Sequence, residues 1–420
     1  MADSAYTRRG LLRAAGSGLA VGSLVTGMSG ATRATAEAVT VNVGYASASG
    51  RDAALDRASA LQHEFGFDAV TVRMPTSETD ALAARSDVRY VEENRVLGGG
   101  ITPRLQPRRR VDGQRAPYGV AVTGADVAAE AGYTGDGAHV AVLDTGIDST
   151  HPDLAATLGR STAFVPGIGD IEEFDFPPGQ DDDLLVSHGT HVAGVVGAND
   201  NDIGVVGVSP AATLHAVKVL VGVLGGGSAA AVAAGVEFVA DRGWDVANLS
   251  LGDAEPSGVL ADAVTDAYDR GVLVVAAAGN DGSLESDPPA SDGDSAVSYP
   301  AAFEEVVAVG ATDRNDDLAA FSSTGPEVGV VAPGAGVLST ALPVNIYSTR
   351  EEPVNRYIRL SGTSFAAPHV AGAGALLMSD AGLSNVEARE RLRETAVDVG
   401  LREEEQGAGR LDVSAALGVE

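Results

Sequence analysis

Three short segments, far apart in the chain, carry the residue types of a nucleophilic hydrolase. They read Asp144-Thr-Gly, His188-Gly-Thr-His and Gly362-Thr-Ser364-Phe-Ala-Ala-Pro-His, in that order. A serine hydroxyl attacks a carbonyl at neutral pH only beside a base, and a carboxylate can orient a histidine that serves as that base. Each segment alone is weak evidence, because a single histidine is usually structural. Together they predict a nucleophile at Ser364, a base at His188 and an acid at Asp144.

The elements that must position these residues form an alternating pattern from about residue 113 onward. The strands are expected at His139–Leu143, Leu214–Leu220, Val246–Leu251, Leu273–Ala278 and Val306–Gly310. The helices are expected at Thr190–Ala198, Ser228–Arg242, Val259–Arg270, Ser364–Ser379 and Asn385–Ala396. Because continuous Val, Leu and Ala strands are buried on both faces, the pattern predicts an α/β fold with a doubly wound, mostly parallel sheet and helices on both faces.

This fold would gather ligands at the carboxyl ends of its strands. Asp144 directly follows one expected strand and Asn280 ends another. His188 and Ser364 each begin an expected helix, whose positive dipole end favours developing negative charge. The placement therefore agrees with a catalytic site.

A smaller unit is expected at residues 39–97, where strands and helices alternate as β-α-β-α-β. The three strands are expected at Val39–Val43, Ala69–Arg73 and Val88–Val91, and the two helices near Asp52–Glu64 and Glu78–Arg85. This order suits a small α+β sheet with its helices on one face. A Gly- and Arg-rich stretch follows it and reads as an exposed linker.

The N-terminus carries an export pattern. Thr7-Arg8-Arg9-Gly10-Leu11-Leu12 precedes a small, apolar run from Ala14 to Met28, and Ala34-Thr35-Ala36 offers a cleavage site. The twin-arginine translocation machinery reads such a pair. A short N-terminal helix is the alternative, but the glycines in the run make a soluble helix poor. Residues 1–38 are therefore interpreted as a twin-arginine signal, and the protein as secreted and extracellular. No membrane anchor is expected after processing, because no later apolar run is long enough.

Composition narrows the functional class further. The chain has 420 residues, 28 basic and 58 acidic, for a formal net charge of −30, and no cysteine. Nucleic-acid binding is not expected, because no basic surface is available to neutralise phosphates. Disulfides and thiol chemistry are excluded. Lys218 is the only lysine. Solubility alone needs far less charge, so the acidity favours a protein adapted to concentrated salt, which screens carboxylate repulsion.

The three segments and their order resemble the subtilisin family of serine proteases (subtilases), for which the order Asp, His, Ser is the reference case. With the acidic composition, the chain is similar to the secreted halophilic halolysins. The resemblance implies an inhibitor-type prodomain at residues 39–100 that folds and inhibits the enzyme in cis. It also implies a linker and maturation region at 101–116 and a monomeric catalytic domain at 117–420. A permanent regulatory domain is the alternative to a prodomain removed by self-cleavage.

The resemblance also implies a substrate groove and an oxyanion donor. Asn280 matches the family's side-chain donor to the oxyanion, with the backbone N–H of Ser364 as the second donor. The remaining matches are Gly225, Gly226 and Gly227 on the edge that pairs with substrate, and Ser250, Leu251 and Gly252 on the wall of the first specificity pocket. Glycine permits the close approach that strand addition requires. A flexible glycine loop is the alternative reading.

Calcium is the cofactor that the resemblance implies, for structure rather than chemistry. The matching ligand positions are Gln114, Asp153, Asn199, Asn201, Ile203 and Val205. Hard oxygen donors from side chains and carbonyls suit Ca²⁺. An ordinary acidic loop is the alternative.

Two features depart from the family. An acidic insertion lies between Asn280 and Tyr299, so side-chain preference cannot be carried over, and Phe365 follows the nucleophile where methionine is usual. The sequence therefore predicts a secreted serine endopeptidase, made as a self-processing precursor, that acts on polypeptides through an acyl-enzyme. The alternatives are a dedicated processing protease with a narrow substrate and a noncatalytic peptide-binding module.

Overall fold

The computed structural model describes residues 38–97, 111, 113–166, 171–175, 187–221, 226–282, 295–342 and 356–419. The export pattern, Gly225, most of the linker and most of the acidic insertion lie outside these ranges. Contacts divide the chain into two compact units. Residues 38–64 and 68–94 form the smaller one, and nearly all described residues from Arg95 onward form the larger one.

The smaller unit is a four-stranded sheet with helices. Its strands lie in the order β2-β3-β1-β4, and β1 pairs antiparallel with both β3 and β4. Its own core contains Val43, Val70 and Leu82. The elements are β1 (Ala38–Tyr45), α2 (Ala48–Arg57), β2 (Ala60–Phe65), β3 (Ala69–Pro75), η1 (Thr76–Glu78), α3 (Thr79–Ala83) and β4 (Val88–Glu93).

The expected helix near Asp52–Glu64 is therefore wrong in its second half. The helix ends at Arg57 and residues 60–65 form strand β2. Most residues of β2 are half-buried or exposed, because it is an edge strand of the sheet. Such a strand lacks the strict apolar alternation that identifies strands in a sequence.

The larger unit is built on an eight-stranded sheet in the order β14-β13-β12-β11-β6-β9-β7-β8. Every pairing from β14 through β7 is parallel, which confirms the expected α/β fold. The strands are β6 (His139–Asp144), β7 (Leu158–Pro166), β8 (Ile171–Asp175), β9 (Thr213–Lys218), β11 (Val246–Leu249), β12 (Leu273–Ala277), β13 (Val307–Thr312) and β14 (Val328–Pro333). Two further antiparallel pairs join β5 (Val96–Leu97) to β10 (Gly227–Ser228), and β15 (Val337–Thr340) to β16 (Tyr357–Leu360).

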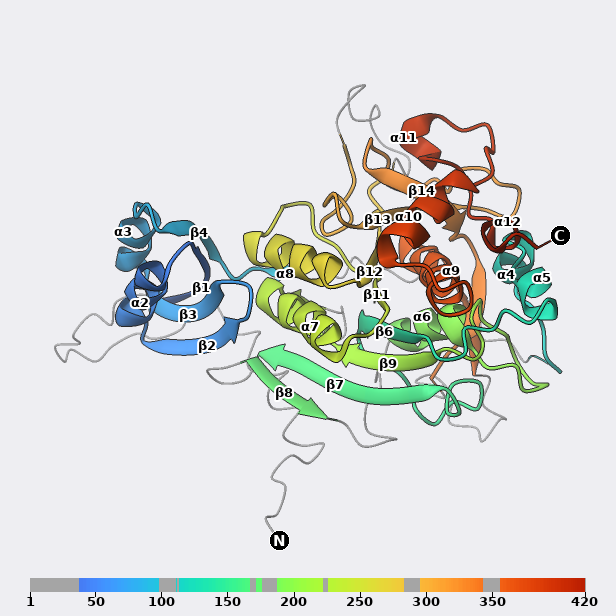
Figure 1. The fold of residues 1–420 in the computed structure, drawn as a ribbon, viewed down its shortest axis with the longest axis horizontal. Helices are drawn as coiled ribbons and strands as arrows, with labels where there is room; N and C mark the ends of the chain where they lie inside the picture. The colour runs from blue at the N-terminus through green and yellow to red at the C-terminus, as the bar shows by residue number, and fades with distance from the viewer. Residues whose placement is uncertain are drawn as a thin grey trace, which may run out of the picture. The chain divides into compact units, whose positions relative to one another are not determined.

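Helices cover both faces of this sheet (Figure 1). Gly235 of α7 lies against Leu143 and Val217 on one face, whereas Gly374 of α9 lies against Leu273 on the other. The helices are α4 (Tyr118–Val122), α5 (Ala125–Glu130), α6 (His188–Gly197), α7 (Ala229–Arg242), α8 (Gly258–Asp269), α9 (Ala367–Ser379), α10 (Asn385–Glu394), α11 (Glu403–Gln406) and α12 (Val413–Leu417), with a 3-10 turn η2 (Thr363–Phe365) before α9.

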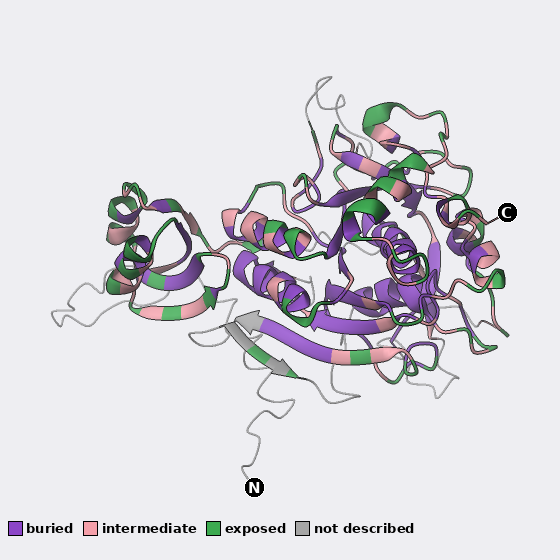
Figure 2. Cartoon of the chain, in the orientation of Figure 1, coloured by how far each residue is buried: buried purple, intermediate pink, exposed green. Residues whose placement is uncertain are grey.

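Burial is concentrated around the central strands and the helices nearest to them (Figure 2). All ten residues of α6 are buried, as are all five of β12. When a helix is buried on every side, its side chains must be apolar or must have hydrogen-bond partners inside the protein. The two histidines of α6 consequently lie inside the protein rather than on its surface. Within the described residues, no helix has the length and apolar character needed to cross a membrane.

Candidate active site

The candidate acid lies at the carboxyl end of a central strand. Asp144 is the last residue of β6, and its side chain is fully buried. Its Oδ1 accepts hydrogen bonds from the backbone N–H of Thr145 at 2.7 Å and from the Thr145 hydroxyl at 3.1 Å. The ammonium of Lys218, the only lysine, donates to the carbonyl oxygen of Thr145. The carboxylate is thus held by fixed dipoles, which a buried charge requires.

The candidate base begins the helix that faces this strand. His188 is the first residue of α6, and its Nδ1 lies 2.8 Å from Asp144 Oδ1 and 2.9 Å from Oδ2. A carboxylate only accepts, so Nδ1 donates and the basic lone pair is on Nε2. Glycine is required at position 189, because a Cβ there would collide with the carbonyl oxygen of Gly146. That close approach brings the helix onto the loop after Asp144.

Two further histidines lie deep beside the site. Burial lowers the pKa of His191 to about 3 and that of His369 to about 4, so both are neutral. His191 Nε2 donates to the carbonyl oxygens of Val337 and Ile358, and His369 Nδ1 donates to that of Phe365. These bonds hold α6 and α9 against neighbouring backbone, so the two histidines have a structural role.

The candidate nucleophile lies in a short turn before α9. Ser364 belongs to η2, so the expectation that it begins the α-helix is wrong by three residues. Its hydroxyl donates to the carbonyl oxygen of Ser250 at 3.3 Å, and the Ser250 hydroxyl donates to that of Ser364 at 2.8 Å. Asn248 Nδ2 in turn donates to the Ser250 hydroxyl at 2.9 Å. The end of β11 therefore holds the nucleophile segment in place.

A carboxamide of fixed orientation lies beside the nucleophile. Asn280 Oδ1 accepts from the backbone N–H of Thr363 at 2.9 Å and from its hydroxyl at 3.2 Å. With the oxygen so occupied, Nδ2 is the end of the amide that can donate to a substrate. Gly279 has a φ of 114°, and a Cβ there would meet the hydroxyls of Ser298 and Ser323. Strand β12 ends at Ala277, so Asn280 lies three residues beyond the strand that it was expected to end.

The expected substrate groove is partly described. Gly225 lies outside the described residues, whereas Gly226 bridges Val221 and Gly227 belongs to β10. Strand β5 pairs antiparallel with β10, so that Leu97 is opposite Gly227. Leu97 is buried. The glycine edge thus accepts an extended segment by strand addition.

The expected wall of the specificity pocket directly follows β11. Ser250 and Leu251 are buried, and Ser250 is bonded to the nucleophile segment as described above. A Cβ at Gly252 would meet the Cβ of Ser298. Ser298 therefore lies next to both Gly252 and Gly279, where only glycine fits.

The expected calcium positions also come together, around Asp153. Its carboxylate is fully buried; Oδ2 accepts from the N–H of Val205 at 3.0 Å, whereas Oδ1 has no hydrogen-bond partner. Gln114 spans the loop. Its Nε2 donates to the carbonyl oxygen of Asn199, and its Oε1 accepts from the backbone N–H of Asp202. Asn201 Oδ1 accepts from Ile203 N–H at 3.1 Å. No cluster of three or more His, Cys, Asp or Glu occurs among the described residues, so any metal here would depend on amide and carbonyl oxygens.

Two contributors to the site, Thr363 and Asn248, were missed from the sequence, and the ring packing of Phe365 was not predicted. Thr363 orients Asn280, Asn248 anchors Ser250, and the Phe365 ring lies between two histidines. The ring centroid of Phe365 is 5.3 Å from that of His188 and 4.6 Å from that of His191. Thr363 and Phe365 are the sequence neighbours of Ser364, so their positions alone indicated that they lie in the site. The Asn248 contact depends on a long-range approach of strands that no local pattern reveals.

Similarity to known proteins covers most of the larger unit. The sequence profile of the subtilase family matches residues 135–409. An alkaline protease from Shouchella clausii is 42% identical over 342 residues, which are 81% of this chain and 77% of that protein. Subtilisin Savinase from Lederbergia lenta is 46% identical over 288 residues, 68% of this chain and 93% of the relative. Subtilisin DY from Bacillus licheniformis is 42% identical over 304 residues, 72% of this chain and 99% of the relative.

Proposed function

Because the chain belongs to the subtilase family and is a serine endopeptidase that acts on polypeptides, we propose that Ser364, His188 and Asp144 carry out the reaction. The observation that best supports these roles is the buried bond from His188 Nδ1 to Asp144. It fixes the imidazole tautomer that leaves Nε2 as the base. The Ser364 segment is packed against the same helix through Phe365.

The reaction follows from these positions. Ser364 Oγ attacks the scissile carbonyl while His188 Nε2 takes its proton, and Asp144 stabilises the imidazolium that forms. Asn280 Nδ2 and the backbone N–H of Ser364 donate to the oxyanion. His188 then gives the proton to the leaving amine. Water, deprotonated by the same imidazole, attacks the acyl-enzyme and releases Ser364.

Casein hydrolysis and fluorophosphonate labelling of purified protein test this function. We expect wild-type protein to cleave unfolded casein and to be labelled on Ser364, and Ser364→Ala to do neither. Labelling without cleavage of casein would instead indicate a processing protease with a narrow substrate. A folded wild type that is not labelled would indicate a noncatalytic peptide-binding module and overturn the proposal.

We further propose that residues 39–100 are a prodomain removed by self-cleavage within or near 101–116. Two observations support this. Residues 38–94 form a separate compact unit with its own core, and the segment after it, β5, pairs with the glycine edge as an extended substrate would. Ser364→Ala made in a protease-free host should accumulate as a precursor that retains this unit. Mature-sized protein from this variant would exclude self-processing.

Calcium is proposed as a structural cofactor held by Asp153 and its surrounding loop. The buried Oδ1 without a partner fits a cation, because an orphaned buried carboxylate oxygen is otherwise costly. The oxygens of Gln114, Asn199, Asn201, Ile203 and Val205 would complete the ligand set. When bound, the ion would stabilise the fold by mass action rather than take part in the reaction. Chelation should therefore shorten the half-life of activity on heating with the initial rate nearly unchanged, and Asp153→Ala should mimic it. An unchanged half-life in both tests would argue against the site.

The proposed setting is export through the twin-arginine pathway into concentrated salt, as a halolysin-type monomer. The support is the Arg8-Arg9 pattern and the net charge of −30. Repulsion among carboxylates extends over about 10 Å at 0.1 M salt and only about 3 Å at 1 M. Activity and the unfolding midpoint should therefore fall as salt is lowered below about 1 M. Full stability in dilute buffer without calcium would contradict the halophilic interpretation.

A further inference from the structure

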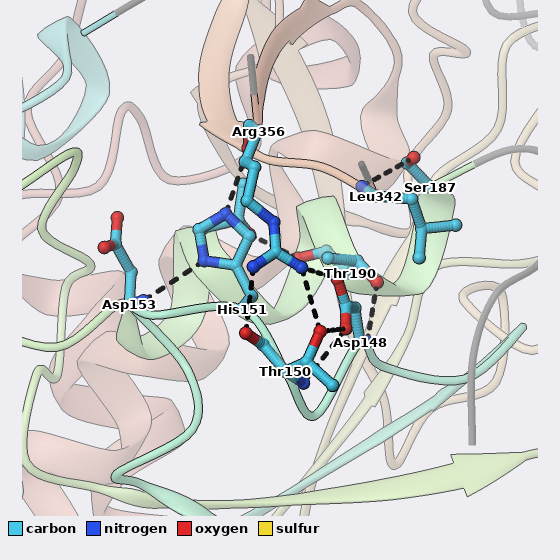
Figure 3. Close-up of polar contacts among 9 residues, drawn as sticks. Asp148, Thr150, His151, Asp153, Ser187, Thr190, Leu342 and Arg356 are labelled. Carbon is cyan, nitrogen blue, oxygen red and sulfur yellow. Dashed lines mark hydrogen bonds and ion pairs between the residues drawn. The ribbon is translucent and has the colours of Figure 1, made fainter. Parts of the chain in front are cut away.

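An ion pair outside the proposed triad connects all three of its segments. Arg356 donates from one terminal nitrogen to Asp148 Oδ2 at 2.6 Å, and the two side chains are 21% and 5% exposed. Figure 3 shows the guanidinium of Arg356 against the turn formed by Asp148 and Thr150. The same guanidinium donates to the carbonyl oxygen and the hydroxyl of Thr150, each at 2.9 Å. The turn and the arginine are thus joined at three points.

Both oxygens of the Asp148 carboxylate have partners: Oδ2 is bonded to Arg356 and Oδ1 is bonded within the turn. Its Oδ1 accepts from the Thr150 N–H at 2.9 Å and from the Thr150 hydroxyl at 2.7 Å. Burying an ion pair gains little stability over an apolar pair of the same shape, because both charges lose water. Such a pair does fix geometry, because the planar guanidinium can donate well to only a few arrangements of oxygen atoms. The observed contacts define the path of the loop.

That loop carries the proposed acid and touches the helix of the proposed base. Asp148 is four residues after Asp144, and its backbone N–H donates to the Thr190 hydroxyl at 2.9 Å. Thr190 is two residues after His188 in α6 (Figure 3). The Asp148 backbone thereby joins the segment of the acid to that of the base.

Arg356 brings in the third segment. It immediately precedes β16, the strand that leads to Ser364 eight residues later. Its carbonyl oxygen accepts from His151 Nε2 at 3.0 Å and from the Ala341 N–H at 2.6 Å. His151 Nδ1 accepts from the backbone N–H of Asp153 at 3.1 Å, which leaves Nε2 as the donor to Arg356. The backbone of Arg356 is therefore fixed independently of its side chain.

We propose that Arg356 is a positioning residue for peptide-bond hydrolysis. Through Asp148 it aligns the loop of the proposed acid, the helix of the proposed base and the strand leading to the proposed nucleophile. The inference rests on the proposed roles of Asp144, His188 and Ser364. Loss of the ion pair displaces these segments relative to one another, and small displacements of catalytic groups reduce rates by up to about 100-fold. Among the described residues, the hydrogen bonds of Arg356 are with the 148–151 turn and Ala341 rather than with the substrate groove, so substrate affinity should be preserved.

The test compares two arginine variants that each lose one ion pair. Arg356→Met removes the pair proposed to act on the triad. Arg410→Met is the matched control, because Arg410 forms a comparable pair with Asp316 at 2.5 Å, with side chains 12% and 28% exposed. Both variants should lower the unfolding midpoint. Rates are measured well below the lower of the two midpoints.

The measured quantities are the second-order rate of fluorophosphonate labelling and the separate kcat and KM for a small peptide anilide. We expect Arg356→Met to label about 10–100 times more slowly, with kcat reduced in parallel and KM unchanged. Arg410→Met should match the wild-type rates. Arg356→Lys keeps the charge but loses the planar fork, so it should recover only part of the labelling rate.

Wild-type labelling rates in Arg356→Met, or an equal loss in Arg410→Met, would overturn the inference and reduce the pair to a stabilising contact. If Arg356→Met does not fold, the labelling rate of Arg356→Lys relative to wild type decides instead, and no change would count against the inference. Failure of wild-type protein itself to be labelled would reject the proposed function rather than this inference alone.

Discussion

The two halves of the candidate site are held in different ways. The acid–base half, on β6 and α6, is charged, buried and fully bonded, with Asp144 bound by His188 and Thr145 at 2.7–3.1 Å. The nucleophile half, on η2 and residues 279–280, is held by neutral hydrogen bonds, and the Ser364 hydroxyl makes a long one of 3.3 Å to a backbone carbonyl. The first half has its buried charge fully hydrogen-bonded before substrate arrives, whereas the second has a hydroxyl whose only bond among the described residues is long.

This difference has a physical reason. A buried carboxylate must be compensated at all times, because an unpaired charge in the interior costs far more than an unpaired hydroxyl. A serine hydroxyl must leave its resting partner when it attacks, so a weak bond there is an advantage. Catalytic hydrogen bonds often shorten only when substrate binds. We therefore expect substitutions in the acid–base half to reduce kcat more than substitutions on the oxyanion side.

The largest effect is expected from Asp144→Asn. The amide would present an N–H group to His188 Nδ1, favour the wrong imidazole tautomer and leave Nε2 unable to act as the base. The loss of kcat should be about 10⁴-fold, the figure known for this substitution in a serine-protease triad. It is measured on a peptide anilide with protein shown to be folded by circular dichroism. A loss smaller than that of Asn280→Ala would reverse the comparison between the halves.

The oxyanion side should respond less strongly. Asn280→Ala removes the Nδ2 donor and should reduce kcat about 10²–10³-fold with little change in KM, a range established on subtilisin itself. Thr363→Val is the matched variant, because it keeps the 2.9 Å backbone bond to Asn280 and loses only hydroxyl bonds: the one to Asn280 at 3.2 Å and those with the carbonyl oxygen and N–H of Gly279 at 3.1 and 3.2 Å. It should lose much less activity. Equal losses in both would mean that the hydroxyl of Thr363, and not the amide, carries the effect.

The sequence predicted the acid–base half better than its surroundings. Asp144 and His188 lie at the ends of strongly apolar elements, so their positions follow from strand and helix patterns that are local. The central strands were found for the same reason. Strands β7 and β2 were missed because polar residues interrupt their apolar pattern; β7 reads Leu-Gly-Arg-Ser-Thr-Ala-Phe-Val-Pro.

The contacts that align the site were not predictable in this way. Arg356 and Asp148 are 208 positions apart, and Ser250 and Ser364 are 114 apart. Such pairs depend on how strands far apart in the chain come together, which neither spacing nor composition encodes. The buried Oδ1 of Asp153 is similar, because only the folded loop reveals that it lacks a partner.

Acid should destabilise both halves through their buried histidines. The folded-state pKa values of His191 and His369, about 3 and about 4, lie below the ordinary value of 6.5. The unfolded chain therefore binds more protons below about pH 6.5, and stability, complete above that pH, declines as pH falls by about 1.4 kcal/mol per unit for each histidine. Urea unfolding from pH 8 to about pH 4 measures this. Ser364→Ala protein avoids autolysis.

Separate histidine variants would show whether one half dominates this pH dependence. His191→Gln, in α6, and His369→Gln, in α9, should each make the decline shallower by the contribution of one group. If neither variant changes the slope between about pH 6.5 and pH 4, the acid sensitivity comes from other groups.

The smallest effect is expected at Phe365, the residue that joins the two halves. It directly follows Ser364, its side chain is buried, and its ring packs against His188 at 5.3 Å. Phe365→Met would remove a ring contact of about 0.5–1.5 kcal/mol, so untreated activity should change only a few-fold. It would also place an oxidisable sulfur beside the nucleophile, and conversion to a polar sulfoxide there should disturb the oxyanion site.

Peroxide distinguishes these two consequences when each protein is compared with its own untreated rate. Wild type should retain activity, because Met378 lies near the far end of α9, whose 13 residues span about 20 Å. Phe365→Met should lose most of its activity, whereas Phe365→Leu, which lacks both the ring and the sulfur, should retain it. If the Met and Leu variants were equally insensitive to peroxide, oxidation next to Ser364 would not reach the oxyanion site, and Phe365 would connect the halves by packing alone.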